Sequence, residues 1–374
     1  MDEGYSRRDF LRRLPGLFRR SAASFAESLP EALKGGKLEK PAIPTVAIPP
    51  LHMPLDGLPV ESPWAATAFA CAEKLTRRLP FGLLLGASGE AFRTVWSDTD
   101  REEAAATAPL NTFLTACGVA GLSAAAAPGG PFEPARAGAV TAVRRGGCLV
   151  VLALRSGPAV LLESFDGRRE VRLARADPGP AVLGFEELER EWMEGWWPSG
   201  RAPFLRVLLS SGPPLRPLSE VAPLALRTVS AMLEPREAGG LSFGVAAWEA
   251  MAAAAREGRM PDDAADPFYM EILPALAAGR AAAGPFLEAL GRALPANERA
   301  GVVEAAGLFR KVHEGDPAGD LYGTGLLPDL AACLLTDQLP DPARIADPAI
   351  RAEAARLLTE IHATESRALG TLHY

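Results

Sequence analysis

The sequence predicts an α+β fold followed by an all-α region. Helical patterns come before residue 146, strand patterns run from 146 to 209, and only helical patterns follow residue 218. Helices that lead into antiparallel strands favour packed layers over alternating βαβ units. The chain has 374 residues, which exceeds the usual size of one domain. We therefore expect a basic tail and Pro-rich linker over 1–45, an α+β domain over 46–215 and a helical domain over 216–374.

The first 40 residues are basic although the whole chain is acidic. They hold nine Lys and Arg against six Asp and Glu, while the net charge of the chain is −7. The stretch S-R-R-D-F-L-R at 6–12 resembles the twin-arginine export motif. An export signal also needs an uninterrupted apolar segment, and here Arg12, Pro15 and Arg19 interrupt it. We therefore predict a cytoplasmic protein, with twin-arginine export as the alternative.

The tail has a second interpretation as a basic amphipathic helix. Phe10, Leu14 and Phe18 recur at helical spacing between the arginines. Such a helix could dock on the body of the protein, on a partner or on an anionic membrane surface. We expect no transmembrane span, because no apolar run reaches the roughly 18 residues that one needs.

The composition of the remaining chain excludes several classes of function. An acidic body is a poor partner for nucleic acid phosphates. The four cysteines form no CxxC pair and no metal-ligand spacing, so we predict neither a metal site nor a cofactor. The chain also lacks a phosphate-binding loop and a dinucleotide fingerprint.

The α+β region begins after a Pro-rich connector over 37–63. Ser62 and Pro63 are typical of a helix start, with Ser as N-cap and Pro in the first turn. We predict a helix through residue 79 and a chain break at 86–89. Further helices are predicted over 108–117 and 134–145.

Aliphatic runs separated by turn residues predict the sheet. The predicted strands cover 148–154, 159–165, 170–174 and 202–209. Apolar residues at helical spacing then predict the helices of the last region, separated by Pro, Gly and Asp. These helices cover 218–233, 241–257, 267–294, 298–314, 326–335 and 347–372.

Several motifs, in this order, resemble butirosin-biosynthesis-H-like proteins, which belong to the papain-like, bacteriocin-processing-peptidase-like group. The segment F-G-L-L-L-G-A-S-G-E-A-F-R at 81–93 is similar to the family's G-x-S-G-x-A-F-R motif. The stretch 146–167 is similar to its paired strands. The segments 243–251 and 281–290 are similar to two of its downstream helices.

This resemblance implies a papain-like cysteine-peptidase-type domain followed by a helical bundle. A papain-like site places a Cys at the start of a long helix and a His on a facing strand. The matching helix start, at 62–67, holds no Cys, and the matching strands, at 157–165, hold no His. The thiol dyad is therefore predicted to be lost. Cys71 is the nearest thiol on that helix, about two and a half turns further in, and its apolar neighbours favour a core role.

Two hypotheses of function follow. The first is a non-catalytic papain-like domain that binds a peptide, an acyl carrier protein or a small molecule. Its site would lie between the helix that starts at Ser62 and the strands of 146–165. The expected ligand-binding residues are Ser62, Trp64, Ser88, Glu90, Arg93 and Asp166. The second is an acyltransferase or amidohydrolase with Cys71 or Cys148 as nucleophile, because the resemblance implies acyl transfer from a carrier protein to an amine.

Overall fold

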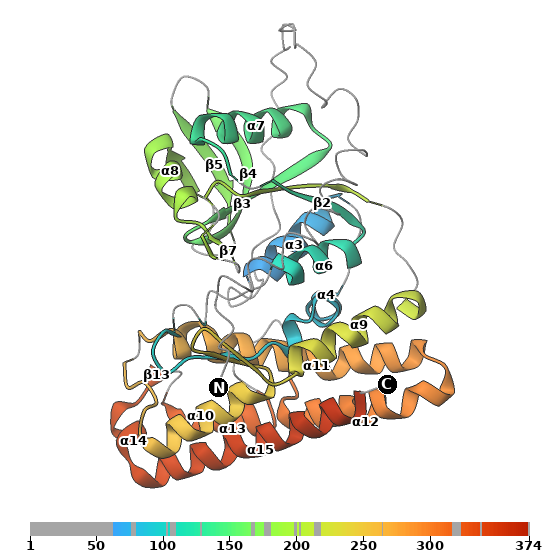
Figure 1. Cartoon of the computed structure of the whole chain (residues 1–374), viewed down its shortest axis with the longest axis vertical. Helices are drawn as coiled ribbons and strands as arrows, with labels where there is room; N and C mark the ends of the chain where they lie inside the picture. Colours follow the sequence, from blue (N-terminus) through green and yellow to red (C-terminus); the bar gives the residue numbers. More distant parts are fainter. Residues whose placement is uncertain are drawn as a thin grey trace, which may run out of the picture. The chain divides into compact units, whose positions relative to one another are not determined.

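In the computed structural model, the described residues form an antiparallel sheet with its own helices and a larger set of helices from the C-terminal half of the chain (Figure 1). The structure describes residues 63–75, 80–101, 104, 110–127, 129–165, 169–175, 181–197, 200–201, 203–212, 218–263, 265–315, 323–336 and 339–372. The tail over 1–45, Ser62 and Asp166 lie outside these residues, so what we expect of them stays a prediction. The mixture of helices with antiparallel strands agrees with the α+β class.

The main sheet has the strand order β2-β9-β3-β4-β5-β6, and every neighbouring pair is antiparallel. Strands β3 to β6 are consecutive in the chain, whereas β9 lies between β2 and β3. The bounds are β2 Leu122–Ala127, β3 Cys148–Leu154, β4 Gly157–Phe165, β5 Glu170–Ala174, β6 Ala181–Gly184 and β9 Arg206–Ser211. The predictions for β3 and β5 are confirmed. The strand predicted over 202–209 begins later, at Arg206.

Two helices cover one face of the sheet. Helix α7 (Phe132–Arg145) packs on β3 and β4, and α8 (Phe185–Met193) packs on β3, β5 and β6 (Figure 1). Their shared core surrounds Trp192, which is fully buried and donates its indole N–H to the carbonyl oxygen of Leu205 at 2.8 Å. A buried indole that keeps a hydrogen-bond partner adds a large apolar surface to the core without leaving a polar group unsatisfied.

Helix α3 (Pro63–Leu75) packs against β4 and β9, and α6 (Leu110–Val119) packs against α3 and β2. The hydroxyl of Ser211 on β9 donates to the carbonyl oxygen of Leu75 at 3.0 Å, which ties the end of α3 to the sheet. The helix predicted to start at Ser62 therefore lies against the predicted strands.

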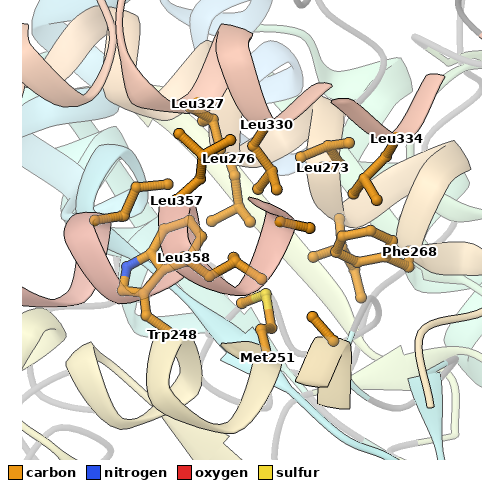
Figure 2. Packing of buried hydrophobic residues seen from close by; sticks show 14 of the residues in the cluster. Trp248, Met251, Phe268, Leu273, Leu276, Leu327, Leu330, Leu334, Leu357 and Leu358 are labelled. Atoms are coloured by element: carbon orange, nitrogen blue, oxygen red, sulfur yellow. The ribbon is translucent and has the colours of Figure 1, made fainter. Parts of the chain in front are cut away.

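The C-terminal half is mainly helical, as the periodicity predicts. Its elements are α9 Leu218–Leu233, α10 Val245–Glu257, the π-helix Phe268–Ile272, α11 Leu273–Ala293, α12 Ala296–Val312, α13 Leu326–Leu334, α14 Pro342–Ala346 and α15 Pro348–Leu372. Figure 2 shows one of its cores, where Trp248, Met251 and Phe268 meet leucines of α11, α13 and α15. Two short hairpins lie in this half as well, β10 (Arg236–Ala238) with β11 (Leu241–Phe243) and β12 (Leu335–Thr336) with β13 (Leu339–Pro340).

The prediction of one helix over 241–257 is wrong at its beginning. Residues 241–243 form the strand β11, which pairs with β10 and with β1 (Val95–Trp96), and α10 starts only at Val245. Gly244 separates the two elements with a positive φ of 60°. A side chain at that position would collide with the carbonyl oxygens of Leu233 and Glu234.

Among the described helices, none is both long and apolar enough to cross a membrane.

Candidate functional site

The family-like segment 81–93 folds as two short helices that meet at a glycine. Helix α4 covers Phe81–Ser88 and the 3₁₀ helix η2 covers Glu90–Phe92. Gly89 between them has a φ of 83°, in the left-handed region that favours glycine. The break predicted at 86–89 is confirmed only at Gly89. It is wrong at 86–88, because these residues belong to α4, a helix that the sequence does not predict.

Two glycines allow this segment to lie very close to helix α11. A Cβ at Gly86 would overlap the ring of Phe286 on α11. In the other direction, a Cβ at Gly279 of α11 would lie 3.2 Å from the Cα of Ala91. These close approaches make the segment part of the packed interior of the helical half.

Arg280 on α11 holds the end of this segment by its backbone. Its side chain has no exposed surface. Nη1 donates to the carbonyl oxygens of Ala91 at 2.8 Å and Arg93 at 3.1 Å, and Nη2 donates to the hydroxyl of Thr94. A guanidinium offers five N–H donors, so these three bonds leave two for another acceptor.

Glu365 on α15 accepts the remaining two donors. Its Oε1 lies 2.6 Å from Nε of Arg280, and its Oε2 lies 3.0 Å from Nη2. Oε2 also accepts the indole N–H of Trp248 on α10 at 2.9 Å. All five donors of Arg280 are satisfied, so this buried charge joins the family-like segment, α10, α11 and α15.

The sequence alone does not predict this network. The two charged residues are 85 positions apart, and each lies within a helix. The available signal was that Arg280 interrupts the apolar stretch over 276–283, because a lone charge on the buried face of a helix requires a partner.

Three of the predicted ligand-binding residues lie in the family-like segment. Ser88 is buried, and its hydroxyl donates to the carbonyl oxygen of Leu85 at 2.9 Å and accepts the N–H of Glu90 at 3.2 Å. Glu90 pairs with Arg93, with 2.8 Å between Oε1 and Nε. The other oxygen of Glu90, Oε2, is buried without a hydrogen-bond partner. This oxygen is buried, so a ligand could reach it only if the segment shifted.

The remaining candidates on helix α3 lie among aromatic and apolar side chains. Trp64 stacks edge-to-face on Phe113 of α6, with 5.1 Å between ring centroids. Cys71 and Cys117, on α3 and α6, are both fully buried, and desolvation raises the pKa of each thiol. Protonated thiols are poor nucleophiles, so both residues act as core side chains in this conformation.

The two other thiols are less deeply buried, but their surroundings also favour the thiol form. Cys148 on β3 donates from Sγ to the carbonyl oxygen of Ala142 at 3.3 Å, and burial raises its pKa. Desolvation raises the pKa of Cys333 on α13 as well. The two described histidines, His313 and His362, lie after α12 and on α15.

His313 is a buried polar side chain without a hydrogen-bond partner. Its ring is almost fully buried, and neither nitrogen has a hydrogen-bond partner. Burial lowers the pKa of His313 to about 4, because the charged imidazolium would lose its hydration. Within the described ranges, no group of His, Cys, Asp and Glu is arranged to hold a metal ion.

No protein-family model matches the chain, and no curated protein matches it significantly.

Proposed function

We propose that this protein is a non-catalytic binding protein with a papain-like α+β domain. It would hold a peptide, an acyl carrier protein or a small molecule without forming a covalent intermediate. The observation that carries the proposal is the state of the thiols: burial raises the pKa of all four cysteines. A cysteine nucleophile needs the opposite, namely a partly exposed thiol whose pKa is lowered by a nearby positive charge or a histidine.

The arrangement of α3 supports the papain-like part of the proposal. In that architecture, a helix that carries the nucleophile packs against an antiparallel sheet that carries the base. Here α3 packs against β4 and β9, but its described first turn begins with Pro63 and Trp64 and carries no thiol. The ligand would lie near this end of α3 and the family-like segment. Glu90 Oε2 lacks a hydrogen-bond partner but is buried, so binding through it would require the family-like segment to move and expose it.

The alternative is an acyltransferase or amidohydrolase that uses Cys71 or Cys148. Cys148 is the thiol with more solvent access, so it is the better candidate of the two in the described conformation. This alternative requires a rearrangement that brings a base to the thiol, because the described histidines lie on or next to helices of the C-terminal half.

Intact-mass spectrometry with a panel of acyl-pantetheine thioesters separates the two functions. We expect no mass increase in the wild-type protein over hours at pH 8. A mass increase of one acyl group would overturn the proposal if hydroxylamine removes it and if either Cys71→Ala or Cys148→Ala abolishes it. Cys333→Ala serves as the matched control, because Cys333 lies on α13, which packs against α11, α12 and α15.

The binding part is tested by titrating the same thioesters and short peptides against Glu90→Gln and Arg93→Met. We expect weaker binding in both variants, with circular dichroism spectra like that of the wild type. Unchanged affinity in both variants would show that the family-like segment does not take part in ligand binding.

A further inference from the structure

Among the described residues, the strand β2 (Leu122–Ala127) forms one edge of the main sheet. It pairs with β9, and in the described chain no second strand lies beside it. Its six residues, L-S-A-A-A-A over Leu122–Ala127, include no charge and no proline. Edge strands in natural proteins usually carry a charged residue or a proline, because these residues prevent unwanted strand pairing. An edge without them is free to accept a further strand.

The opposite edge of the sheet differs. Strand β6 has only four residues, and α8 follows it at once and packs on it. A short edge strand that is followed directly by a helix is a protected edge. The comparison therefore points to β2 as the edge that accepts a strand.

Arg206, at the start of β9, gives this edge a charge preference. Its side chain is half-buried, and desolvation lowers the pKa of its guanidinium. No hydrogen bond or ion pair compensates for this loss of hydration within the described structure, in contrast to Arg280. A partly desolvated guanidinium without a carboxylate is complementary to an anionic group.

The guanidinium lies on the face of the sheet that α7 covers. A Cβ built on Gly138 of α7 would lie 3.5 Å from its Nη2. Directly paired residues of antiparallel strands point to the same face, so Ala127 and Ala125 of β2 share this face with Arg206 and Leu208. On this face of β2, the described side chains opposite Arg206 and Leu208 are the methyl groups of Ala127 and Ala125. Two strand spacings amount to about 10 Å, which an Arg and a Glu side chain span together.

We propose that the outer edge of β2 binds an extended acidic peptide by strand addition, with a carboxylate of the peptide paired to Arg206. Backbone hydrogen bonds to β2 would supply affinity, and Arg206 would supply the preference for acidic side chains. A second copy of this chain fits less well, because antiparallel pairing of β2 with β2 brings no carboxylate to Arg206. This proposal concerns a different surface from the thiols of the proposed function, so the two can fail separately.

Fluorescence anisotropy with the full chain tests the proposal. The probe is a fluorescein-labelled peptide of alternating Glu and Val, and the control is the same peptide with Lys in place of Glu. We expect saturable binding of the Glu peptide and about tenfold weaker binding by Arg206→Met, which corresponds to the loss of one charged pair. Arg145→Met, which removes an exposed charge at the end of α7, should bind like the wild type.

A second variant does not depend on removing the arginine. Ala127→Glu places a carboxylate directly opposite Arg206 on the same face, so it should occupy the guanidinium from within the chain and also weaken binding about tenfold. The proposal is overturned by equal binding of the two peptides, by wild-type affinity in both variants, or by no saturable binding up to about 1 mM peptide. If an equal concentration of inorganic phosphate displaced the peptide, the site would bind anions in general, and the proposal of strand addition would be overturned. If the wild-type protein formed a dimer and Ala127→Glu dissociated it, the edge of β2 would bind a second copy of the chain and the peptide proposal would be overturned.

Discussion

Arg280 and Glu365 form a bidentate ion pair in which neither side chain has any exposed surface. The pair also binds Trp248, Thr94 and the backbone of the family-like segment. Because both charges are buried, the energy of the pair depends on every donor and acceptor being matched. The ion pair therefore connects the family-like segment, α10, α11 and α15, which lie far apart in the sequence.

Removal of one partner should therefore be costly. Arg280→Met leaves the carboxylate of Glu365 buried without its cation, and we expect the free energy of unfolding to fall by about 3–5 kcal/mol. Urea denaturation followed by circular dichroism measures the loss. The double variant Arg280→Met/Glu365→Leu should recover part of it, because no buried charge remains.

The matched control for that prediction is an exposed pair. Arg356 on α15 lies 2.7 Å from Glu353 one turn earlier and 3.0 Å from Glu360 one turn later, and its side chain is about half exposed. Arg356→Met should leave the urea midpoint unchanged within error, because solvent screens exposed pairs. If Arg280→Met and Arg356→Met lowered the free energy of unfolding equally, the buried ion pair would not be the more important of the two for stability.

Gly86→Ala tests the close packing of the family-like segment on α11. The added methyl group overlaps the ring of Phe286, so we expect the free energy of unfolding to fall by about 1–3 kcal/mol. Gly307→Ala on α12 meets no atom within 4 Å and should raise stability by about 0.5–1 kcal/mol through helix propensity. Partial rescue of Gly86→Ala by Phe286→Leu would identify the ring as the obstacle. Equal effects of the two glycine substitutions would argue against the close approach.

His313 predicts a loss of stability in mild acid. Its pKa is about 4 in the folded chain and about 6.5 when unfolded, so the unfolded state binds more protons between these values. The contribution of His313 to the free energy of unfolding is therefore fully present above pH 6.5. It decreases as the pH falls towards 4, by at most about 3 kcal/mol. Urea midpoints of wild type and His313→Leu between pH 4 and 7.5 measure the difference.

In that experiment, carboxylates titrate in both proteins, so only the difference between the two pH profiles reports on His313. His362→Leu, at a half-buried position on α15, controls for the loss of any histidine. Parallel pH profiles for wild type and His313→Leu would show that the ring is not held neutral by burial.

The sequence predicts best where one local pattern decides the structure. The aliphatic run at 148–154 is long enough for a buried strand and is bounded by turn residues, so β3 is correct to the residue. Helix α9 is correct for a similar reason, because its apolar residues keep one period over its whole length. In both elements, the local preference and the burial of one face agree.

The sequence fails where a distant partner decides the structure. The four alanines of β2 favour a helix by propensity, yet pairing with β9 makes them a strand. The short strand β11 lies in a segment predicted as helix, and it pairs with the distant strand β1 as well as with its neighbour β10. Of the candidate site, the sequence indicated the segment that holds Ser88, Glu90 and Arg93, but it could not show that Arg280 holds the backbone of that segment.

The burial of the four cysteines predicts that none of them is an activated nucleophile. Alkylation rates of the four native thiols between pH 5 and 9, read by peptide mass spectrometry, test it most directly. Since burial raises all four pKa values, we expect Cys148 and Cys333 to react slowly, with apparent pKa values above the ~8.5 of a free thiol, and Cys71 and Cys117 to stay protected until the protein unfolds. One thiol that reacts rapidly at pH 6 would contradict the claim and would identify the nucleophile of an enzyme.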